Sequence, residues 1–208
     1  MAIIYFYHIP KTGGTYVNQY LKNLSIYLKA KYISFYDNSP NVSYLNKKKY
    51  INTFMHLDLN KHYIFHHHHG FPGLKFSYIY LKTLRDKLEQ NNIKFIMFTI
   101  LSKNNYICKY LLYNKEYNLY PNIINNISNN NEYNILLKMI SIFSFIIDIN
   151  EIYKLKNIIE NILNIKLLNM PNNKINKTNY IKNINYNQIQ IIKKYNLVDI
   201  NFINIKKK

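Results

Sequence analysis

Residues 3–16 decide the fold of this chain, and they read IIYFYHIPKTGGTY. The first five of these residues are β-branched or aromatic, which is the composition of a buried strand. After the two glycines, apolar side chains recur at the spacing of one helix face. The sequence therefore predicts a strand, a glycine turn and a helix in that order. The predicted apolar face of the helix consists of Val17, Tyr20, Leu21, Leu24, Tyr27 and Leu28.

The predicted turn has the chemistry of an anion site. Gly13 and Gly14 allow backbone N–H groups to approach a ligand closely, and the N-terminus of the following helix adds donors with partial positive charge. Lys11 adds a full charge, and Thr12 and Thr15 add hydroxyl donors. We expect a phosphate here, and the alternative is a glycine turn that only caps a helix. Because the lysine precedes the glycines, the nucleotide-triphosphate pattern GxxxxGKS/T is absent, which argues against an ordinary ATPase or kinase.

The rest of the chain continues to alternate between strand and helix patterns. Residues 95–101 are apolar on both faces, which predicts a central parallel strand. The alternation predicts an α/β fold: a single three-layer, P-loop-like domain over residues 1–208, with a central parallel sheet flanked by helices. Further strands are expected at 32–36, 62–66 and 142–149, helices at 76–91, 104–117, near 132, 151–163 and 187–195, a loop at 121–131 and a turn at 171–173.

The composition is strongly basic, with a formal net charge of +18 over 208 residues. Such a charge suits an anionic partner, including a nucleic acid bound through lysines and interleaved tyrosines. However, Asn, Ile, Lys and Tyr dominate the chain, tryptophan is absent and Arg85 is the single arginine. This is the codon bias of an A/T-rich genome, which explains much of the charge. No nucleic-acid-binding module is evident, so nucleic acid is the less favoured partner.

Cysteine usage and hydropathy predict the environment of the chain. Cys108 is the only cysteine, so an intrachain disulfide is excluded. No 18-residue apolar run is present, and the N-terminus does not have the pattern of a secretory signal. We therefore expect a soluble, cytoplasmic protein without a transmembrane segment.

The sequence HIPKTGGT at residues 8–15 follows the first predicted strand. It resembles the 5′-phosphosulfate loop of sulfotransferases that use 3′-phosphoadenosine 5′-phosphosulfate (PAPS). The resemblance is to the carbohydrate branch that includes the heparan 2-O-sulfotransferases. It implies that Lys11 stabilises charge on the leaving phosphate and that no metal is needed. It also implies that the donor is bound by Lys11, Thr12, Gly13, Gly14, Thr15 and Tyr16.

The base for such a reaction is expected in the cluster His66-His67-His68-His69, where a strand ends. A histidine can accept a proton at neutral pH, and in the resembling family a histidine at about this point is the catalytic base. Alternation along the strand sends His66 and His68 to one face and His67 and His69 to the other. We expect His67 and His69 to face the donor, because His69 directly precedes a Gly-Phe-Pro turn. The cluster has two other readings, a metal-binding patch and plain loop histidines.

The resemblance departs from the family after the strand at residues 95–101. Family members have an arginine there, followed about eight residues later by a serine, and both hold the 3′-phosphate of the donor. Here Ser102 and Lys103 stand in that place, and they can supply one hydroxyl donor and one point charge. The predicted function is transfer of a sulfuryl group from PAPS to a hydroxyl of a carbohydrate acceptor. A degenerate member that binds nucleotide or glycan without reaction is the alternative within the same fold.

Overall fold

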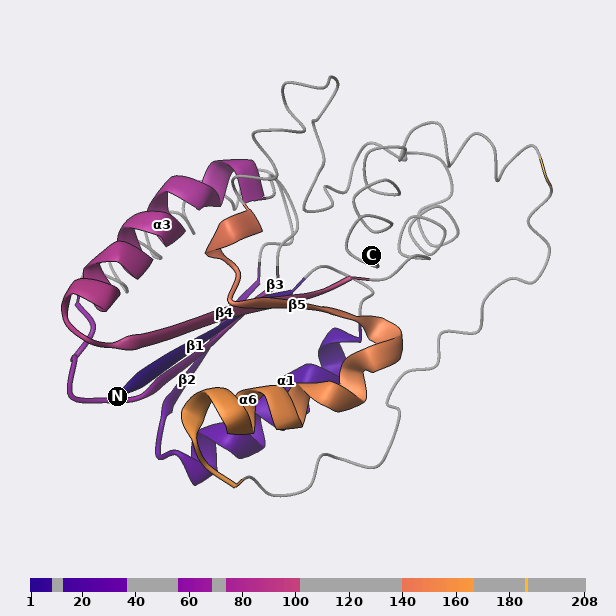
Figure 1. The fold of residues 1–208 in the computed structure, drawn as a ribbon, viewed down its shortest axis with the longest axis horizontal. Helices are drawn as coiled ribbons and strands as arrows, with labels where there is room; N and C mark the ends of the chain where they lie inside the picture. Colours follow the sequence, from indigo (N-terminus) through magenta and orange to yellow (C-terminus); the bar gives the residue numbers. More distant parts are fainter. Residues whose placement is uncertain (9–12, 37–55, 69–73, 102–139, 167–185, 187–208) are drawn as a thin grey trace.

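The computed structural model describes residues 1–8, 13–36, 56–68, 74–101, 140–166 and 186. These residues form a five-stranded sheet with helices on both faces (Figure 1). Neighbouring strands are all parallel, in the order β2-β3-β1-β4-β5. The predicted α/β fold with a parallel sheet is therefore confirmed. The strands are β1 (Ala2–His8), β2 (Lys31–Tyr36), β3 (Tyr63–His68), β4 (Lys94–Leu101) and β5 (Phe145–Asp148).

Strand β1 is the central strand of the sheet. Because it is covered on both faces, all seven of its residues are buried. Ile4 pairs in register with Ile64 of β3 on one side and with Ile96 of β4 on the other. A strand covered on both faces needs a continuous apolar run rather than alternation. The predicted central position of residues 95–101 is also confirmed, since β4 lies between β1 and β5.

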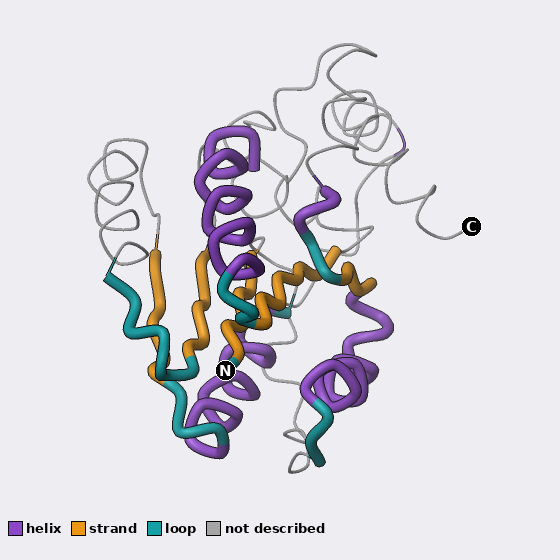
Figure 2. The backbone as a smooth tube through the Cα atoms, turned by 60° about the vertical axis from the view of Figure 1, so that its left-hand side comes forward, coloured by secondary structure: helices purple, strands orange, loops and turns teal. Residues whose placement is uncertain are grey.

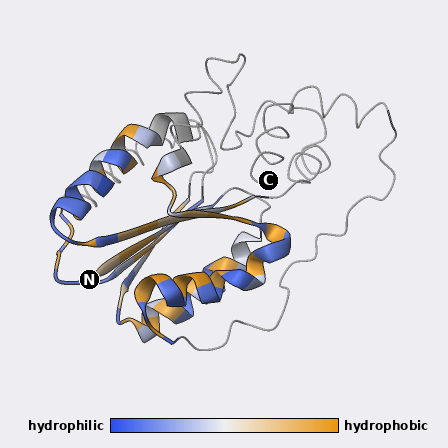
Figure 3. Ribbon diagram, viewed as in Figure 1, coloured by the Kyte–Doolittle hydropathy of each residue, from blue (hydrophilic) through white to orange (hydrophobic). Residues whose placement is uncertain are grey.

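Helices cover the two faces of the sheet from opposite sides, and Figure 2 shows this from a second direction. Helix α1 (Gly14–Tyr27) and helix α6 (Leu155–Leu163) pack on the face that carries Ile4 and Phe6. Helix α3 (Leu74–Gln90) packs on the face that carries Ile3 and Tyr5. Each helix presents hydrophobic and hydrophilic sides (Figure 3), as expected for helices that cover a sheet.

The three helices end in the same way, with a residue in the left-handed backbone conformation. These residues are Lys29, Asn92 and Asn164, whose φ angles are 49°, 56° and 55°. In each case the next amide reaches back to a carbonyl five residues earlier; for Ile93 and Leu88 the N···O distance is 2.9 Å. Such bonds satisfy carbonyls that the end of a helix leaves without partners.

Four features differ from the sequence prediction, and two of them concern strands. Strand β3 continues to His68, so His67 and His68 lie within the strand rather than after it. Strand β5 begins at Phe145 because Ile142 and Phe143 are buried against the α3 layer instead of pairing in the sheet. A 3₁₀ segment, Ile140–Ile142, stands there.

The other two differences concern helices. Residues 149–154 form a 3₁₀ turn before α6, started by the Asp148 carboxylate, which accepts from the Asn150 amide at 2.9 Å. Tyr27, predicted on the buried face of α1, is exposed, because it is the last helical residue and its hydroxyl instead donates to the Lys166 carbonyl. The predictions for 104–117, 121–131, 132, 171–173 and 187–195 lie outside the described residues.

The sheet has a topological switch point at the carboxyl ends of β1 and β3. These strands are neighbours, but the helix that follows β1 covers one face and the helix that follows β3 covers the other. In open α/β sheets, ligands bind where adjacent strands lead to opposite faces in this way. Within the described ranges, no helix is long and apolar enough to cross a membrane.

Candidate active site at the ends of β1 and β3

The glycine turn places the N-terminus of α1 at the carboxyl edge of the sheet. Gly13 has a φ of 76°, a left-handed conformation that favours glycine, and its carbonyl accepts from the Tyr16 amide at 3.1 Å. A Cβ at Gly13 would also lie only 3.2 Å from Cδ1 of Ile152. Gly13, the N-cap residue, has no side chain to cap the helix, and the first turn of α1 contains no acidic residue. The positive end of the helix therefore has no carboxylate of its own in that turn to offset it.

Gly14 is required for a different reason, because the imidazole of His8 lies directly against it. A Cβ added at Gly14 would overlap Nε2, Cε1 and Cδ2 of His8. His8 is the last residue of β1 and is only 7% exposed. The strand end and the helix start therefore fit together only because residue 14 has no side chain.

Gly14→Ala is expected to destabilise the protein by about 1–3 kcal/mol, the usual cost of overpacking a filled site. The added methyl must push the His8 ring away and with it the contacts of that ring. Chemical denaturation measures the loss. Thr15→Ala, at an exposed neighbouring position, is the control and should change stability by less than about 0.5 kcal/mol. Equal stability of the Gly14 variant and the native protein would contradict the described packing.

Three adjacent strands contribute to one hydrogen-bonded series on the α1 face. His8 Nδ1 lies 2.9 Å from His66 Nε2, and His66 Nδ1 lies 3.4 Å from the hydroxyl oxygen of Ser34. The rings of His8 and His66 both stack on Phe6, with centroid distances of 5.2 and 5.4 Å. The aromatic ring fixes the planes of both imidazoles, so their nitrogens stay aligned.

Burial keeps both imidazoles neutral. The pKa of His66 is lowered to about 4, first by burial and then by repulsion from His68, His67 and Lys22. The pKa of His8 is well below its ordinary value, again first by burial and then by the neighbouring histidines. No carboxylate of the described residues is among the groups that act on either ring. A positive charge on either ring is therefore costly.

His68 and His67 lie on opposite faces of β3, as alternation predicts. The His68 ring packs edge-on against the His8 ring, with 4.5 Å between the ring centroids, and His68 is partly exposed at the end of β3. The His67 ring points to the α3 layer, where its Nδ1 is hydrogen-bonded to the Tyr5 hydroxyl and its ring meets Phe35. His67, which we expected to face the donor, therefore lies on the opposite face of the sheet from α1, and the described histidines on the α1 face are His8, His66 and His68.

The other predicted site residues fall into two groups. Gly13, Gly14, Thr15 and Tyr16 begin α1; Thr15 is exposed, and burial raises the pKa of the Tyr16 hydroxyl. Lys11, Thr12, His69, Ser102 and Lys103 lie outside the described residues, and β4 ends at Leu101, directly before the last two of these.

His8 is the site residue that the sequence interpretation did not single out. The signal in the sequence was its position directly after the predicted strand at residues 3–7 and before the glycine turn. Parallel pairing places it opposite His68, and that register could not be read from the chain. In the described part of the chain, no group of three or more His, Cys, Asp or Glu side chains is arranged to hold a metal ion.

Neither a scan against models of known protein families nor a search against curated proteins finds a match for this chain.

Proposed function

We propose that this protein is a PAPS-dependent sulfotransferase with a P-loop-like domain, acting on a hydroxyl of a carbohydrate acceptor. The observation that carries the proposal is the glycine-capped N-terminus of α1, where Gly14 lies against His8, which in turn contacts His66 and His68. A helix N-terminus favours a phosphate group, and neutral imidazoles supply a proton acceptor. These are two of the parts that sulfuryl transfer needs, next to each other.

The residues divide the work of the reaction as follows. We assign the 5′-phosphosulfate to the backbone of Gly13 and Gly14 together with Thr12 and Thr15, and we assign Lys11 to the oxygen that bridges phosphorus and sulfur. His68 takes the acceptor proton, because it is the partly exposed histidine on the α1 face. The acceptor oxygen forms a bond to sulfur while the bond from sulfur to the phosphate oxygen breaks. The electron pair remains on the phosphate, where Lys11 and the helix N-terminus stabilise it.

The placement of the turn supports the P-loop-like part of the proposal. In this sheet the glycine turn follows the central strand β1, next to the switch point between β1 and β3, which is where ligands of parallel α/β folds bind. Ser102 and Lys103 directly follow β4, the other neighbour of β1. We assign them to the 3′-phosphate of the donor.

The test is sulfuryl transfer from ³⁵S-labelled PAPS to a panel of glycans, with donor-site binding measured by titration with 3′-phosphoadenosine 5′-phosphate. We expect Lys11→Ala to weaken nucleotide binding roughly 10- to 100-fold, the worth of one charge-assisted hydrogen bond. His68→Gln should reduce turnover by about 10²-fold or more while leaving nucleotide binding intact, as loss of a general base does. Exposed Lys61→Ala is the matched control for charge.

The outcomes separate the alternatives. Nucleotide binding without transfer to any acceptor would indicate a degenerate member of the fold. Absence of nucleotide binding by the native protein would overturn the proposal, and steeply salt-dependent binding to single-stranded nucleic acid would then favour the nucleic-acid reading.

A further inference from the structure

The series Ser34, His66 and His8 crosses three strands from the solvent to the glycine turn. Ser34 lies on the edge strand β2 and is exposed, whereas His66 and His8 are 1% and 7% exposed. The register places Ser34 opposite His66. The three side chains therefore form a path that begins at water and ends in the interior.

The inner end of this path faces the start of α1. In the described residues, the hydrogen bond of His8 is the one from Nδ1 to His66, and Nε2 is directed at Gly14. The His8 side chain is more than nine-tenths buried and lies next to the N-terminus of α1, where the N-cap residue Gly13 has no side chain. An anion held by this helix N-terminus would lie beside the His8 ring and accept a hydrogen bond from an N–H at Nε2.

We propose that Ser34, His66 and His8 form a proton relay, and that His8 Nε2–H donates to the phosphate or sulfate-ester group bound at the N-terminus of α1. This inference rests on the anion site of the proposed function. It assigns His8 a direct contact with the ligand and makes His66 and Ser34 positioning residues. None of these three residues accepts the proton of the acceptor hydroxyl, because the proposed function assigns that proton to His68.

In the relay, either imidazole can be the donor of the hydrogen bond between His8 Nδ1 and His66 Nε2. Before binding, His66 Nε2–H donates to His8 Nδ1, and both rings are neutral. When the anion binds, the Ser34 hydroxyl passes its proton to His66 Nδ1 and regains one from water. The His66 Nε2 proton moves to His8 Nδ1, so His8 becomes an imidazolium with an N–H at both nitrogens. The net change is one proton taken from solvent and one positive charge on His8.

The charged groups around the pair make this uptake depend on the ligand. His67 and His68 from β3 act on both rings, and Lys22 from α1 acts on His66. All of these groups oppose a further positive charge, and burial opposes it as well. An anion beside Nε2 reverses the balance, because an opposite charge within a few ångströms favours the charged form. Proton uptake should therefore accompany binding rather than precede it.

The experiment is calorimetric titration of the native protein with 3′-phosphoadenosine 5′-phosphate, and separately with inorganic phosphate, near pH 7 in buffers of different ionisation enthalpy. We expect uptake of about one proton per bound nucleotide. In ¹⁵N-histidine spectra, the His8 resonances should change from those of a neutral ring to those of an imidazolium. This spectroscopic readout needs no variant, so it stands even if a substitution impairs folding.

The matched variants are His8→Gln in the relay and His56→Gln at an exposed position outside it. His8→Gln should remove the proton uptake and weaken nucleotide binding roughly 10- to 100-fold, whereas His56→Gln should leave both unchanged. Ser34→Ala interrupts the outer end of the path, so it should slow the proton uptake in a stopped-flow measurement with a pH indicator and leave its final extent and the His8 contact unchanged. Binding without proton uptake, uptake that persists in His8→Gln, or no binding of either anion would overturn the relay.

The results also distinguish this inference from the proposed function. Nucleotide binding with His8-dependent proton uptake, but without sulfuryl transfer to any acceptor, would leave the relay standing and remove the enzyme proposal. Sulfuryl transfer from PAPS without His8-dependent proton uptake would remove the relay alone.

Discussion

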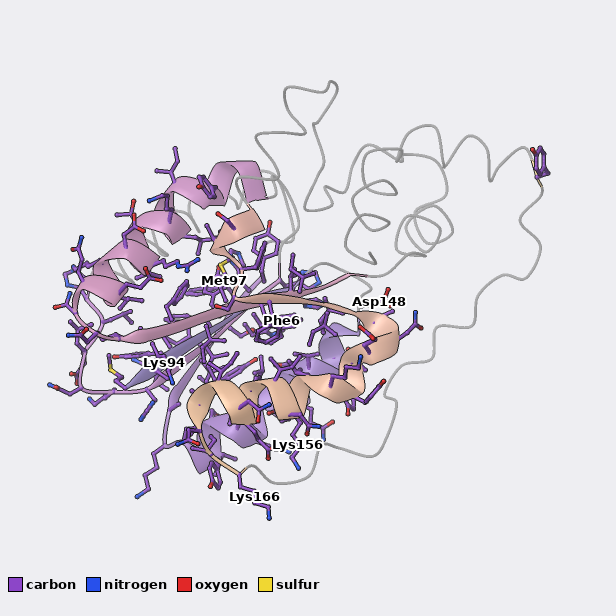
Figure 4. All side chains as sticks on the ribbon, viewed as in Figure 1. Phe6, Lys94, Met97, Asp148, Lys156 and Lys166 are labelled. Carbon is purple, nitrogen blue, oxygen red and sulfur yellow. The ribbon has the colours of Figure 1, made fainter. Side chains whose placement is uncertain are left out.

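Phe6→Ala should destabilise this protein by about 3–5 kcal/mol, the range for removing a fully buried phenylalanine. Phe6 is 0% exposed at the centre of the sheet, on the face covered by α1 and α6 (Figure 4). Its ring stacks on Phe98 at 4.9 Å and on both histidines of the relay. The substitution therefore leaves a cavity and also releases the planes of His8 and His66. Most domains are stable by only about 5–15 kcal/mol, so this variant should be marginal.

Denaturant unfolding followed by circular dichroism gives the stability of the Phe6 variant. Tyr153→Ala is the control for the loss of an aromatic ring, because Tyr153 is 66% exposed and should change stability by less than about 0.5 kcal/mol. Phe6→Leu, which keeps most of the volume, should fall between the two. A loss below about 1 kcal/mol for Phe6→Ala would show that the site collapses freely, against the described packing.

The sheet was predictable because its strands are apolar on both faces. Residues 3–7 and 95–101 could not be surface strands, and their separation by helical patterns left a parallel sheet as the natural solution. The boundaries were harder. The run from Ile142 to Ile149 is apolar throughout, so the pattern could not show that Ile142 and Phe143 fill the core from a 3₁₀ turn instead of a strand.

The candidate site was predictable only as far as local geometry reaches. A strand followed by two glycines and a helix specifies a turn whose backbone can meet an anion, and alternation correctly separated His66 and His68 from His67. Strand register and the face covered by α1 are long-range properties, set by packing between segments about 60 residues apart in the chain. Without the register and the position of α1, the sequence could not show which face His67 occupies or that His8 lies beside His66 and His68.

Acid should destabilise the protein well before its carboxylates titrate. The pKa of His66 is about 4 in the folded protein against an ordinary value of 6.5, and that of His8 is lowered as well. The unfolded chain therefore binds more protons, and stability rises with pH. The contribution of His66 is present above about pH 6.5 and is lost as the pH falls toward about 4, with roughly 2 kcal/mol gone by pH 5 and about 3 kcal/mol by pH 4.

The slope of stability against pH isolates this contribution from the other effects of a substitution. We expect His66→Gln to flatten the dependence between about pH 7 and pH 5 even if it lowers stability overall, because the glutamine amide does not titrate there. His56→Gln removes an exposed histidine and should leave the slope unchanged. A bound anion should flatten the slope as well, since it gives the protonated pair a partner in the folded state. If His66→Gln keeps the native slope, the buried pair is not the origin of the acid sensitivity.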